Sequence, residues 1–496
     1  MVWALITLHA ALFSWLSVAR HASFSSGRFD LGNMVQAVWS TAHGRLLEST
    51  DVSGVQFNRL GAHADPILVL FAPLFRVWPA PESLLLVQAV AVALGALPAF
   101  WLGRLWLRDD RMAVAAAAAY LLYPPLQFAV LFDFHPVTLA APLLLYCIWA
   151  AEMARWWTLG VCGALAALTQ EQVGLMLVTL AVWLAVRHPG RRRAAAVLAG
   201  SALAWVALAN AVIIPHFAVA AVSPHLGRYR ALGSDPGEIL TTLLVRPWEV
   251  AGVVATPGRA LYLVILLAPL LGLPLLAPLL AACALPQLAI NLLASTGPAQ
   301  QIEYHYAAVL VPFLIAAAIM GLARLREQRS PVWLHRLMQR PALVAGGLAA
   351  AVALSGVRLG PLPIWEHVPG VGWPGAPHLR FEPDARARAI ERALAIIPPT
   401  APVSASNDAG AHLSARRRIF LFPTLADAQW IVVTGEDEVR RAARERPGLR
   451  PAAYAGRLDT IRRSPAWRLV LAADGVEVFR RVPPGGVAKA NAGPGA

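Results

Sequence analysis

The side chains of this sequence that could carry out chemistry are acidic, histidine and arginine residues in polar segments between long apolar runs. Asp30, in Phe29-Asp30-Leu31-Gly32, lies shortly after the first apolar run. A carboxylate at such a water–lipid boundary can act as a general base on a molecule held in the membrane. His63 and Glu171 are the other expected catalytic residues. The residues expected to bind substrate are Asp65, Asp133, His135, His225, Arg228, Arg230, Glu303 and His305.

Asp30 also has a purely structural interpretation. Apolar residues of segment 31–42 recur at helical spacing, which predicts a short amphipathic helix lying on the membrane surface. Asp30 immediately precedes this helix, and aspartate is favoured as an N-cap. The capping role and the proton-accepting role are compatible. The apolar stripe comprises Leu31, Met34, Val35, Val38 and Ala42, with Asn33, Gln36 and Ser40 largely off it.

The other acidic and histidine residues could equally be polar residues in ordinary turns. His63 and Asp65 precede a proline and could begin a helix, and Asp133 and His135 occupy a short turn between apolar runs. Glu171 interrupts an apolar run, and a carboxylate deep in a bilayer costs about 2.5–3.5 kcal/mol. A turn near the outer surface lowers that cost, so both interpretations stay open.

Metal and phosphate binding are two further chemistries that these residue types allow. The carboxylates and imidazoles are suitable ligands for a divalent cation, but they come from separate loops without a diagnostic spacing. The sequence therefore assigns no metal site and leaves a divalent cation open. Arg228 and Arg230 suit a lipid phosphate through their planar guanidinium groups, or simple contact with lipid headgroups. No Walker A, Rossmann, HExxH or GxSxG motif supports a nucleotide-driven or serine-hydrolase mechanism.

The composition is that of a polytopic membrane protein. Of 496 residues, 58% are hydrophobic and 14% charged, whereas a soluble domain has about 25% charged residues. We expect segment 2–18 to be the first span, because it lacks a basic region before it and an evident cleavage site. The net charge of +14 comes from arginines that mostly fall between apolar segments, which indicates membrane orientation and not nucleic-acid binding. The three cysteines, Cys147, Cys162 and Cys283, lie in apolar stretches and are expected to be buried hydrophobic residues.

About eleven transmembrane or re-entrant helices are predicted from apolar runs of suitable length. Arginine clusters follow the second, sixth and tenth of them, so a cytoplasmic N-terminus satisfies the positive-inside rule. This orientation places the candidate residues and the C-terminal region outside the cytoplasm. Segment 67–78 is expected to be a further interfacial or re-entrant helix. The predicted segments are 3–19, 83–103, 112–131, 137–152, 156–169, 173–187, 194–214, 259–272, 274–293, 305–322 and 341–357.

The sequence divides into three parts. Residues 1–357 are predicted to form the transmembrane domain, with the outer loop 20–82 carrying interfacial helices. Residues 358–482 should form an extracytoplasmic α/β domain, and the Pro/Gly/Ala-rich tail 483–496 should be disordered. Within the α/β domain we expect helices at 384–397 and 437–446, strands at 403–406 and 430–433, and a hairpin over 467–479 that turns at Asp474-Gly475.

Several of these motifs together resemble a prokaryotic membrane-protein family, domain of unknown function 2079. The resemblance covers roughly residues 25–435. The residues that carry it are Phe29-Asp30-Leu31-Gly32, Gln36-Ala37-Val38-Trp39, Gly44, His63, Ala72-Pro73-Leu74-Phe75, Pro79, Tyr123-Pro124-Pro125, Asp133-Phe134-His135-Pro136, Glu171, the stretch 225–233, His305-Tyr306 and Val403-Ser404-Ala405-Ser406-Asn407.

That family is similar to the GT-C superfamily of membrane glycosyltransferases. The resemblance implies hexosyl or pentosyl transfer from a polyprenyl-phosphate donor to a glycan, lipid or protein acceptor. It also implies an active site on the extracytoplasmic side of a bacterial inner membrane, with Asp30 as the base. Many GT-C enzymes have a second acidic residue beside the first, whereas Leu31 follows Asp30 here.

A transporter or flippase of a lipid-linked or small polar solute is the alternative from a different class. Pro269, Pro274 and Pro278 interrupt the eighth and ninth predicted spans, as in transporters with broken helices. Such proteins usually contain internal repeats, and this sequence shows no convincing one. Its acidic residues gather on one predicted face of the membrane, which favours the enzyme.

Overall fold

The computed structural model describes residues 1–219, 226–295, 297–327, 339–362, 379–435 and 451–483. These residues are mostly helical and form two compact units, which we describe separately. The helical unit comprises Met1–Trp15, Leu60–Ile67 and the described part of Leu86–Leu379. The loop–sheet unit comprises Leu16–Arg59, Leu68–Leu85 and the described part of Arg380–Ala496. Much of the first outer loop therefore belongs to the same compact unit as the C-terminal residues. The domain boundary at residue 357 stays a prediction.

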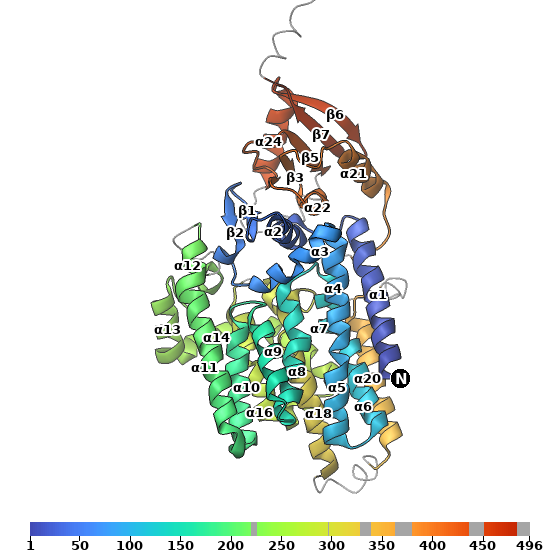
Figure 1. Ribbon diagram of the computed structural model, residues 1–496, viewed down its shortest axis with the longest axis vertical. Helices are drawn as coiled ribbons and strands as arrows, with labels where there is room; N and C mark the ends of the chain where they lie inside the picture. Colours follow the sequence, from blue (N-terminus) through green and yellow to red (C-terminus); the bar gives the residue numbers. More distant parts are fainter. Residues whose placement is uncertain (220–225, 296, 328–338, 363–378, 436–450, 484–496) are drawn as a thin grey trace, which may run out of the picture. The chain divides into compact units, whose positions relative to one another are not determined.

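The helical unit consists of helices that pack in neighbouring pairs: α5 on α6, α8 on α9, and α10 on α11 (Figure 1). Helix α1 (Val2–Ala22) and helix α4 (Pro81–Leu94) each contribute part of their length to this unit. The other helices are α5 (Ala96–Leu107), α6 (Asp110–Leu122), α7 (Pro124–Leu131), α8 (Ala140–Glu152), α9 (Trp156–Ala167), α10 (Val173–Arg187), α11 (Arg192–Leu208), α12 (Ile214–Phe217), α13 (Pro236–Val245), α14 (Pro247–Val254), α15 (Pro257–Leu267), α16 (Pro278–Ala281), α17 (Leu285–Leu293), α18 (Val311–Glu327) and α20 (Pro341–Leu359).

Four of the described helical segments are long and apolar enough to cross a membrane: Val2–Ala22, Pro81–Leu107, Pro189–Phe217 and Pro341–Leu359. Two further pairs qualify together but are bent, by 46° between α6 and α7 and by 70° after α14. Proline at the start of α7 and of α15 explains both breaks, because it cannot donate the backbone hydrogen bond that would continue a helix. The chain is thus helical and suited to a membrane, and the count of eleven spans stays a prediction.

The loop–sheet unit contains a five-stranded sheet in the order β4-β3-β5-β7-β6 (Figure 1). Strand β3 pairs in parallel with β4 and β5, and the other pairs are antiparallel. Alternate residues of β5 face two apolar clusters, Val432 with α21 and Ile431 with α24, so the whole strand is buried. The elements are β3 (Val403–Ala405), β4 (Ile419–Leu421), β5 (Trp430–Thr434), β6 (Trp467–Ala473), β7 (Val476–Arg481), α21 (Ala385–Ala395), α22 (Asn407–His412) and α24 (Pro451–Arg463).

The helix, strands and hairpin predicted for the C-terminal region are confirmed within the described residues. Helix α21 begins after Asp384, whose carboxylate accepts a hydrogen bond from Ala387 N at 2.7 Å. The β6–β7 hairpin turns at Asp474 and Gly475, with φ of +48° and +76°, as a two-residue hairpin turn requires. The helix expected at 437–446 and the tail after 483 lie outside the described residues. Cys147 and Cys283 are buried and Cys162 is half-buried, all as free thiols.

The first outer loop differs from a helix lying on a surface. Its elements are a π-helical turn, η1 (Arg28–Gly32), then α2 (Asn33–Ala42), and the hairpin strands β1 (Glu48–Thr50) and β2 (Gln56–Asn58). A 3₁₀ turn, η3 (Pro66–Phe71), and α3 (Ala72–Val77) occupy the segment expected to be interfacial or re-entrant. The apolar stripe of α2 is buried, as a packed face should be, but Gln36 and Ser40 are fully buried as well. Helix α2 is therefore enclosed on both its apolar and its polar side.

We expect Ile431→Ala to destabilise the loop–sheet unit by about 2–5 kcal/mol, because a buried side chain in β5 would leave a cavity. Thermal unfolding of the purified protein in detergent should show a lower Tm. The matched control is Leu469→Ala in β6, where the side chain is 51% exposed and the change should stay within about 0.5 kcal/mol. Equal effects of the two substitutions would contradict the double-sided burial of β5.

Candidate functional site

His63 and Glu171 form an ion pair in the helical unit. His63 precedes η3, and Glu171 lies in the turn between α9 and α10. The Nδ1 atom of His63 is 3.0 Å from Oε1 of Glu171, and Ala64 N donates to Oε2 at 3.0 Å. Gln170 Nε2 also lies 3.0 Å from His63 Nδ1. Both carboxylate oxygens are thus engaged, which holds the two turns together.

The environment of Glu171 keeps its carboxyl group ionised. Burial by itself would raise the pKa, but the charge of His63 and the hydrogen bonds from His63 and Ala64 lower the pKa to about 2. A proton acceptor with so low a pKa is weak at neutral pH. The geometry therefore suits Glu171 to orienting His63 better than to accepting a proton itself, and its catalytic role stays a prediction.

A stacked pair of imidazoles joins two other turns of the helical unit. The rings of His135 and His305 lie 3.7 Å apart and are tilted by only 17°. Phe132 and Tyr306 also contact the ring of His305. Burial lowers the pKa of His305 well below its ordinary value, and the nearby positive charges of His135, His63 and Arg228 lower it further. His305 is therefore neutral at physiological pH.

The segment that carries Asp133 and His135 is held by Gln88, a buried residue of α4. Gln88 Nε2 donates to the carbonyl oxygens of Val130 at 3.0 Å and Asp133 at 2.7 Å, and its Oε1 accepts from His135 N at 3.0 Å. Asp133 has a left-handed φ of +53° and is itself buried. Gln88 therefore sets the backbone of this turn. Its only sequence signal was a lone amide within an apolar segment.

Arg228 lies in the 3₁₀ turn η7 (Leu226–Tyr229), with its guanidinium 5.8 Å from the centre of the Tyr306 ring. Ser295 N and Oγ both donate to the Arg228 carbonyl oxygen, at 2.7 and 2.8 Å. The buried Asn291 donates to the Tyr306 carbonyl oxygen at 3.1 Å. Two turns are thereby fixed around a half-buried guanidinium, which is suited to an anionic group.

The remaining substrate-binding candidates of the helical unit differ in exposure. Arg230 is exposed, whereas Asp65 and Glu303 are buried. Burial raises the pKa of Glu303 above its ordinary value, although its own backbone partly offsets this effect. His225 lies outside the described residues. Within the described ranges, no three His, Cys, Asp or Glu side chains lie together as a metal site.

Asp30 belongs to the loop–sheet unit and lies inside the π-helical turn η1. Gly32 N donates to Gly27 O at 3.0 Å, which closes the turn with the five-residue spacing of a π-helix. The N-cap of α2 is Gly32, without a side-chain hydrogen bond, so Asp30 does not have the capping role that the sequence left open beside the catalytic one. The π-helical turn displaces the start of α2 by two residues. The Asp30 side chain is half-buried.

Arg28 anchors the turn from inside the loop–sheet unit. Its side chain is 3% exposed, and Nη2 donates to Gln36 Oε1 at 2.9 Å and to Thr50 O at 3.0 Å. A buried guanidinium without such acceptors would be costly. Gln36, fully buried, also donates to Thr50 Oγ1 at 2.8 Å. These bonds satisfy the buried amide of Gln36, and they tie the turn of Asp30 to strand β1.

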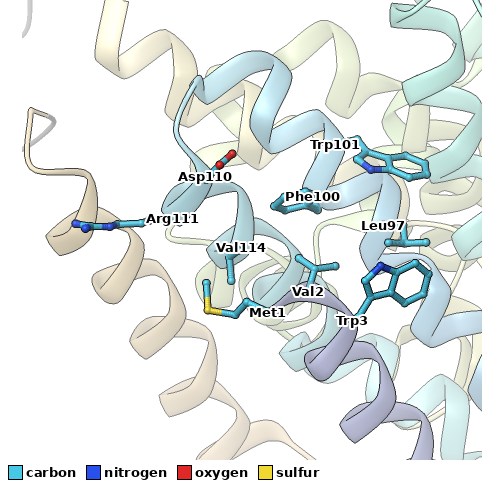
Figure 2. Close-up of a pocket in the computed structure, with 9 residues that line it drawn as sticks. All are labelled: Met1, Val2, Trp3, Leu97, Phe100, Trp101, Asp110, Arg111 and Val114. Atoms are coloured by element: carbon cyan, nitrogen blue, oxygen red, sulfur yellow. The ribbon is translucent and has the colours of Figure 1, made fainter.

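A cavity of about 450 Å³ elsewhere in the helical unit is lined mainly by apolar residues of α1, α5 and α6. Figure 2 shows Trp3, Phe100 and Trp101 around it, with Asp110 and Arg111 at the start of α6. Asp133 and His135 follow α7, at the other end of the bent α6–α7 pair. This cavity is therefore separate from the polar turns and offers few groups to bind a sugar.

Comparisons with known proteins give one family and several distant structures. A family model described as predicted membrane protein (DUF2079) matches residues 20–478. No curated protein matches the chain. Among solved structures, the chain is similar to ArnT from Cupriavidus metallidurans in the apo state, with 14% identity and a TM-score of 0.48, over 97% of this chain and 98% of that one.

Two further similar structures come from Archaeoglobus fulgidus. One is an oligosaccharyltransferase tethered with an acceptor peptide containing the NVT sequon, with 13% identity and a TM-score of 0.41. The other is the archaeal oligosaccharyltransferase AglB in complex with an inhibitory peptide and a dolichol-phosphate, with 11% identity and a TM-score of 0.41. Each match covers 96% of this chain and 74% of the other. Similarities at this level do not assign a reaction to the chain.

The low pKa of Glu171 predicts a specific pH dependence of stability. Because the pKa falls from 4.5 to about 2 on folding, the stabilising effect is complete above pH 4.5 and is lost as the pH falls towards 2. Tm measured from about pH 6 to about pH 3 should show Glu171→Gln less stable than wild type at pH 6, with the gap narrowing on acidification. Glu249→Gln, at an exposed ion pair, should show a small and flat difference. A gap for Glu171→Gln that stays constant with pH would rule out the ion pair as its cause.

Replacing Gln88 by leucine should destabilise the helical unit by about 1–3 kcal/mol for each backbone group left unpaired. Leucine has nearly the same size but cannot bond the carbonyl of Asp133 or the amide of His135. Tm of the purified variant is the measurement. Asn210→Leu is the control, because that exposed amide makes one bond within its own helix, to Val206 O. A Tm of Gln88→Leu equal to that of Asn210→Leu would show that the turn does not depend on this amide.

Proposed function

Because the chain belongs to the DUF2079 family of predicted membrane proteins, we propose that it is a GT-C-type membrane glycosyltransferase. The resemblance of that family to GT-C enzymes supports this proposal, and it implies that Asp30 is the base. The reaction would move a hexosyl or pentosyl unit from a polyprenyl-phosphate donor to a glycan, lipid or protein acceptor outside the cytoplasm. The arginine-rich segments support a cytoplasmic N-terminus in a bacterial inner membrane.

The observation that carries the proposal is the conformation around Asp30. π-helical turns are rare and are frequently found at functional sites. Here Asp30 lies inside such a turn and is half-buried. It does not cap α2, although the local sequence would favour that role. The neighbouring Arg28 is buried and bonded, which fixes the backbone beside Asp30, and Asp30 itself is half-buried.

Asp30 would act as the general base of an inverting transfer. Its carboxylate accepts the proton of the acceptor hydroxyl, whose oxygen forms a bond to the anomeric carbon. The bond between that carbon and the phosphate oxygen breaks, and its electron pair stays on the lipid phosphate. No covalent sugar–protein intermediate is required.

The leaving phosphate would need positive charge and hydrogen-bond donors. Arg228 supplies a half-buried guanidinium, and the neighbouring turns supply His305. His305 is neutral at physiological pH and can donate a single hydrogen bond from its protonated ring nitrogen. Arg230, which is exposed, and His225 are further candidates for phosphate contact.

The sugar itself would be bound by other residues of the polar turns. His63, held by Glu171, would bind a hydroxyl of the donor sugar or the acceptor. The further residues proposed to line these turns are Asp65, Asp133, His135 and Glu303.

We expect Asp30→Asn to reduce transfer by about 10²–10⁴-fold while leaving membrane insertion unchanged, because an amide cannot accept the proton of the acceptor hydroxyl. The assay would use membranes from cells lacking the natural protein, supplied with radiolabelled undecaprenyl-phosphate hexoses and pentoses, with transfer out of the lipid fraction as readout. Asp51→Asn is the matched control, since this aspartate caps the β1–β2 turn through Ser53 and Val55 and an amide keeps an acceptor oxygen there. Unchanged transfer by Asp30→Asn would remove Asp30 as base.

A further inference from the structure

The turn of Asp30 lacks a capping side chain of its own. Its N-cap residue is Gly27, in extended conformation, and it makes no side-chain hydrogen bond. The amides of the first helical turn have no partner within the helix and are usually bonded by a Ser, Thr, Asp or Asn at the N-cap. In η1 the second of these amides is that of Phe29, the residue before Asp30.

Asn407 supplies the missing cap from the other end of the chain. Its Oδ1 accepts a hydrogen bond from Phe29 N at 3.0 Å, between residues 378 positions apart. Asn407 is the first residue of α22, in the connection from β3 to β4, and its side chain is buried. Because η1 and this connection belong to the same compact unit, the bond is part of one packed body.

Glycine at two positions allows this approach. A Cβ on Gly27 would lie 2.8 Å from Asn407 Nδ2, so a capping side chain at Gly27 would collide with the amide that replaces it. A Cβ on Gly410 of α22 would lie 2.8 Å from the Cβ of Arg28. Arg28 also donates through Nη2 to Ile419 O at the start of β4, at 3.3 Å. The turn therefore packs directly against both ends of the β3–β4 connection.

We propose that Asn407 is a positioning residue, which caps the Asp30 turn from the sheet and so fixes the direction of the Asp30 carboxylate. This role rests on the proposed function of Asp30 as base. Asn407 does not touch the reacting atoms and acts through the Phe29 amide. Loss of the cap frees the first turn of η1, so the carboxylate spends less time in the position from which it can accept a proton.

The test compares Asn407→Ala with Ser406→Ala. The hydroxyl of the neighbouring Ser406 bonds to Val432 O and Thr434 Oγ1 of β5, and Ser406→Ala is the matched control. Hydrogen exchange of residues 28–33 in the full-length protein should be about fivefold faster in Asn407→Ala, as expected for loss of one capping bond. Exchange of β5 serves as the internal reference for an intact fold. In the transfer assay, kcat should fall about tenfold with KM unchanged, because ground-state binding is not affected.

A second variant moves the cap to its usual place. Gly27 has φ −112° and ψ 142°, which suit an N-cap serine, and the collision disappears once Asn407 is truncated. The double variant Gly27→Ser with Asn407→Ala should therefore recover both slow exchange and kcat. Unchanged exchange in Asn407→Ala overturns the capping role, and faster exchange with unchanged kcat overturns the positioning role. If the wild type transfers no sugar, the proposed function fails, and exchange alone then decides whether Asn407 caps the turn.

Discussion

A polar group buried among apolar side chains can form hydrogen bonds only with partners inside the protein, because water does not reach it. A buried donor or acceptor left unpaired costs about 1–3 kcal/mol. In the helical unit, Gln88 and Asn291 meet this requirement by donating hydrogen bonds to backbone carbonyl oxygens in turns outside the α-helices. In the loop–sheet unit, Arg28 does so by bonding carbonyl oxygens of two separate segments. The turns that carry candidate residues are thus shaped by the buried amides and the guanidinium bonded to them.

The same burial sorts the charges of the helical unit. The pairing of Glu171 with His63 lowers the pKa of Glu171, which keeps that carboxyl group ionised. Burial lowers the pKa of His305, which keeps that imidazole neutral. Burial favours the protonated form of Glu303 by raising its pKa. Glu171 is paired with His63, whereas no acidic side chain among the described residues forms an ion pair with the guanidinium of Arg228. This balance suits an anionic ligand better than a cation.

Local features of the sequence predicted local structure well. The pair Asp474-Gly475 correctly predicted the hairpin turn, and Asp384 correctly predicted the start of α21. Both features depend only on neighbouring residues. The π-helical turn around Asp30 could not be predicted from neighbouring residues, because it is stabilised by Arg28 and by residues far along the chain. The stacking of His135 on His305 joins turns about 170 residues apart, so no spacing could reveal it. Gln88 and Asn407 were missed for the same reason, since their function lies in distant backbone atoms.

The separation of 378 residues between Phe29 and Asn407 also has a consequence for how the protein is made. A growing chain is synthesised from its N-terminus at about 5–20 residues per second, so the first outer loop exists well before its cap does. Until α22 has been translated and has folded against η1, the Asp30 carboxylate sits on an uncapped turn. A nascent or truncated chain would therefore insert its helices without holding this carboxylate in place. The capped state of this turn therefore becomes available only after α22 has been synthesised.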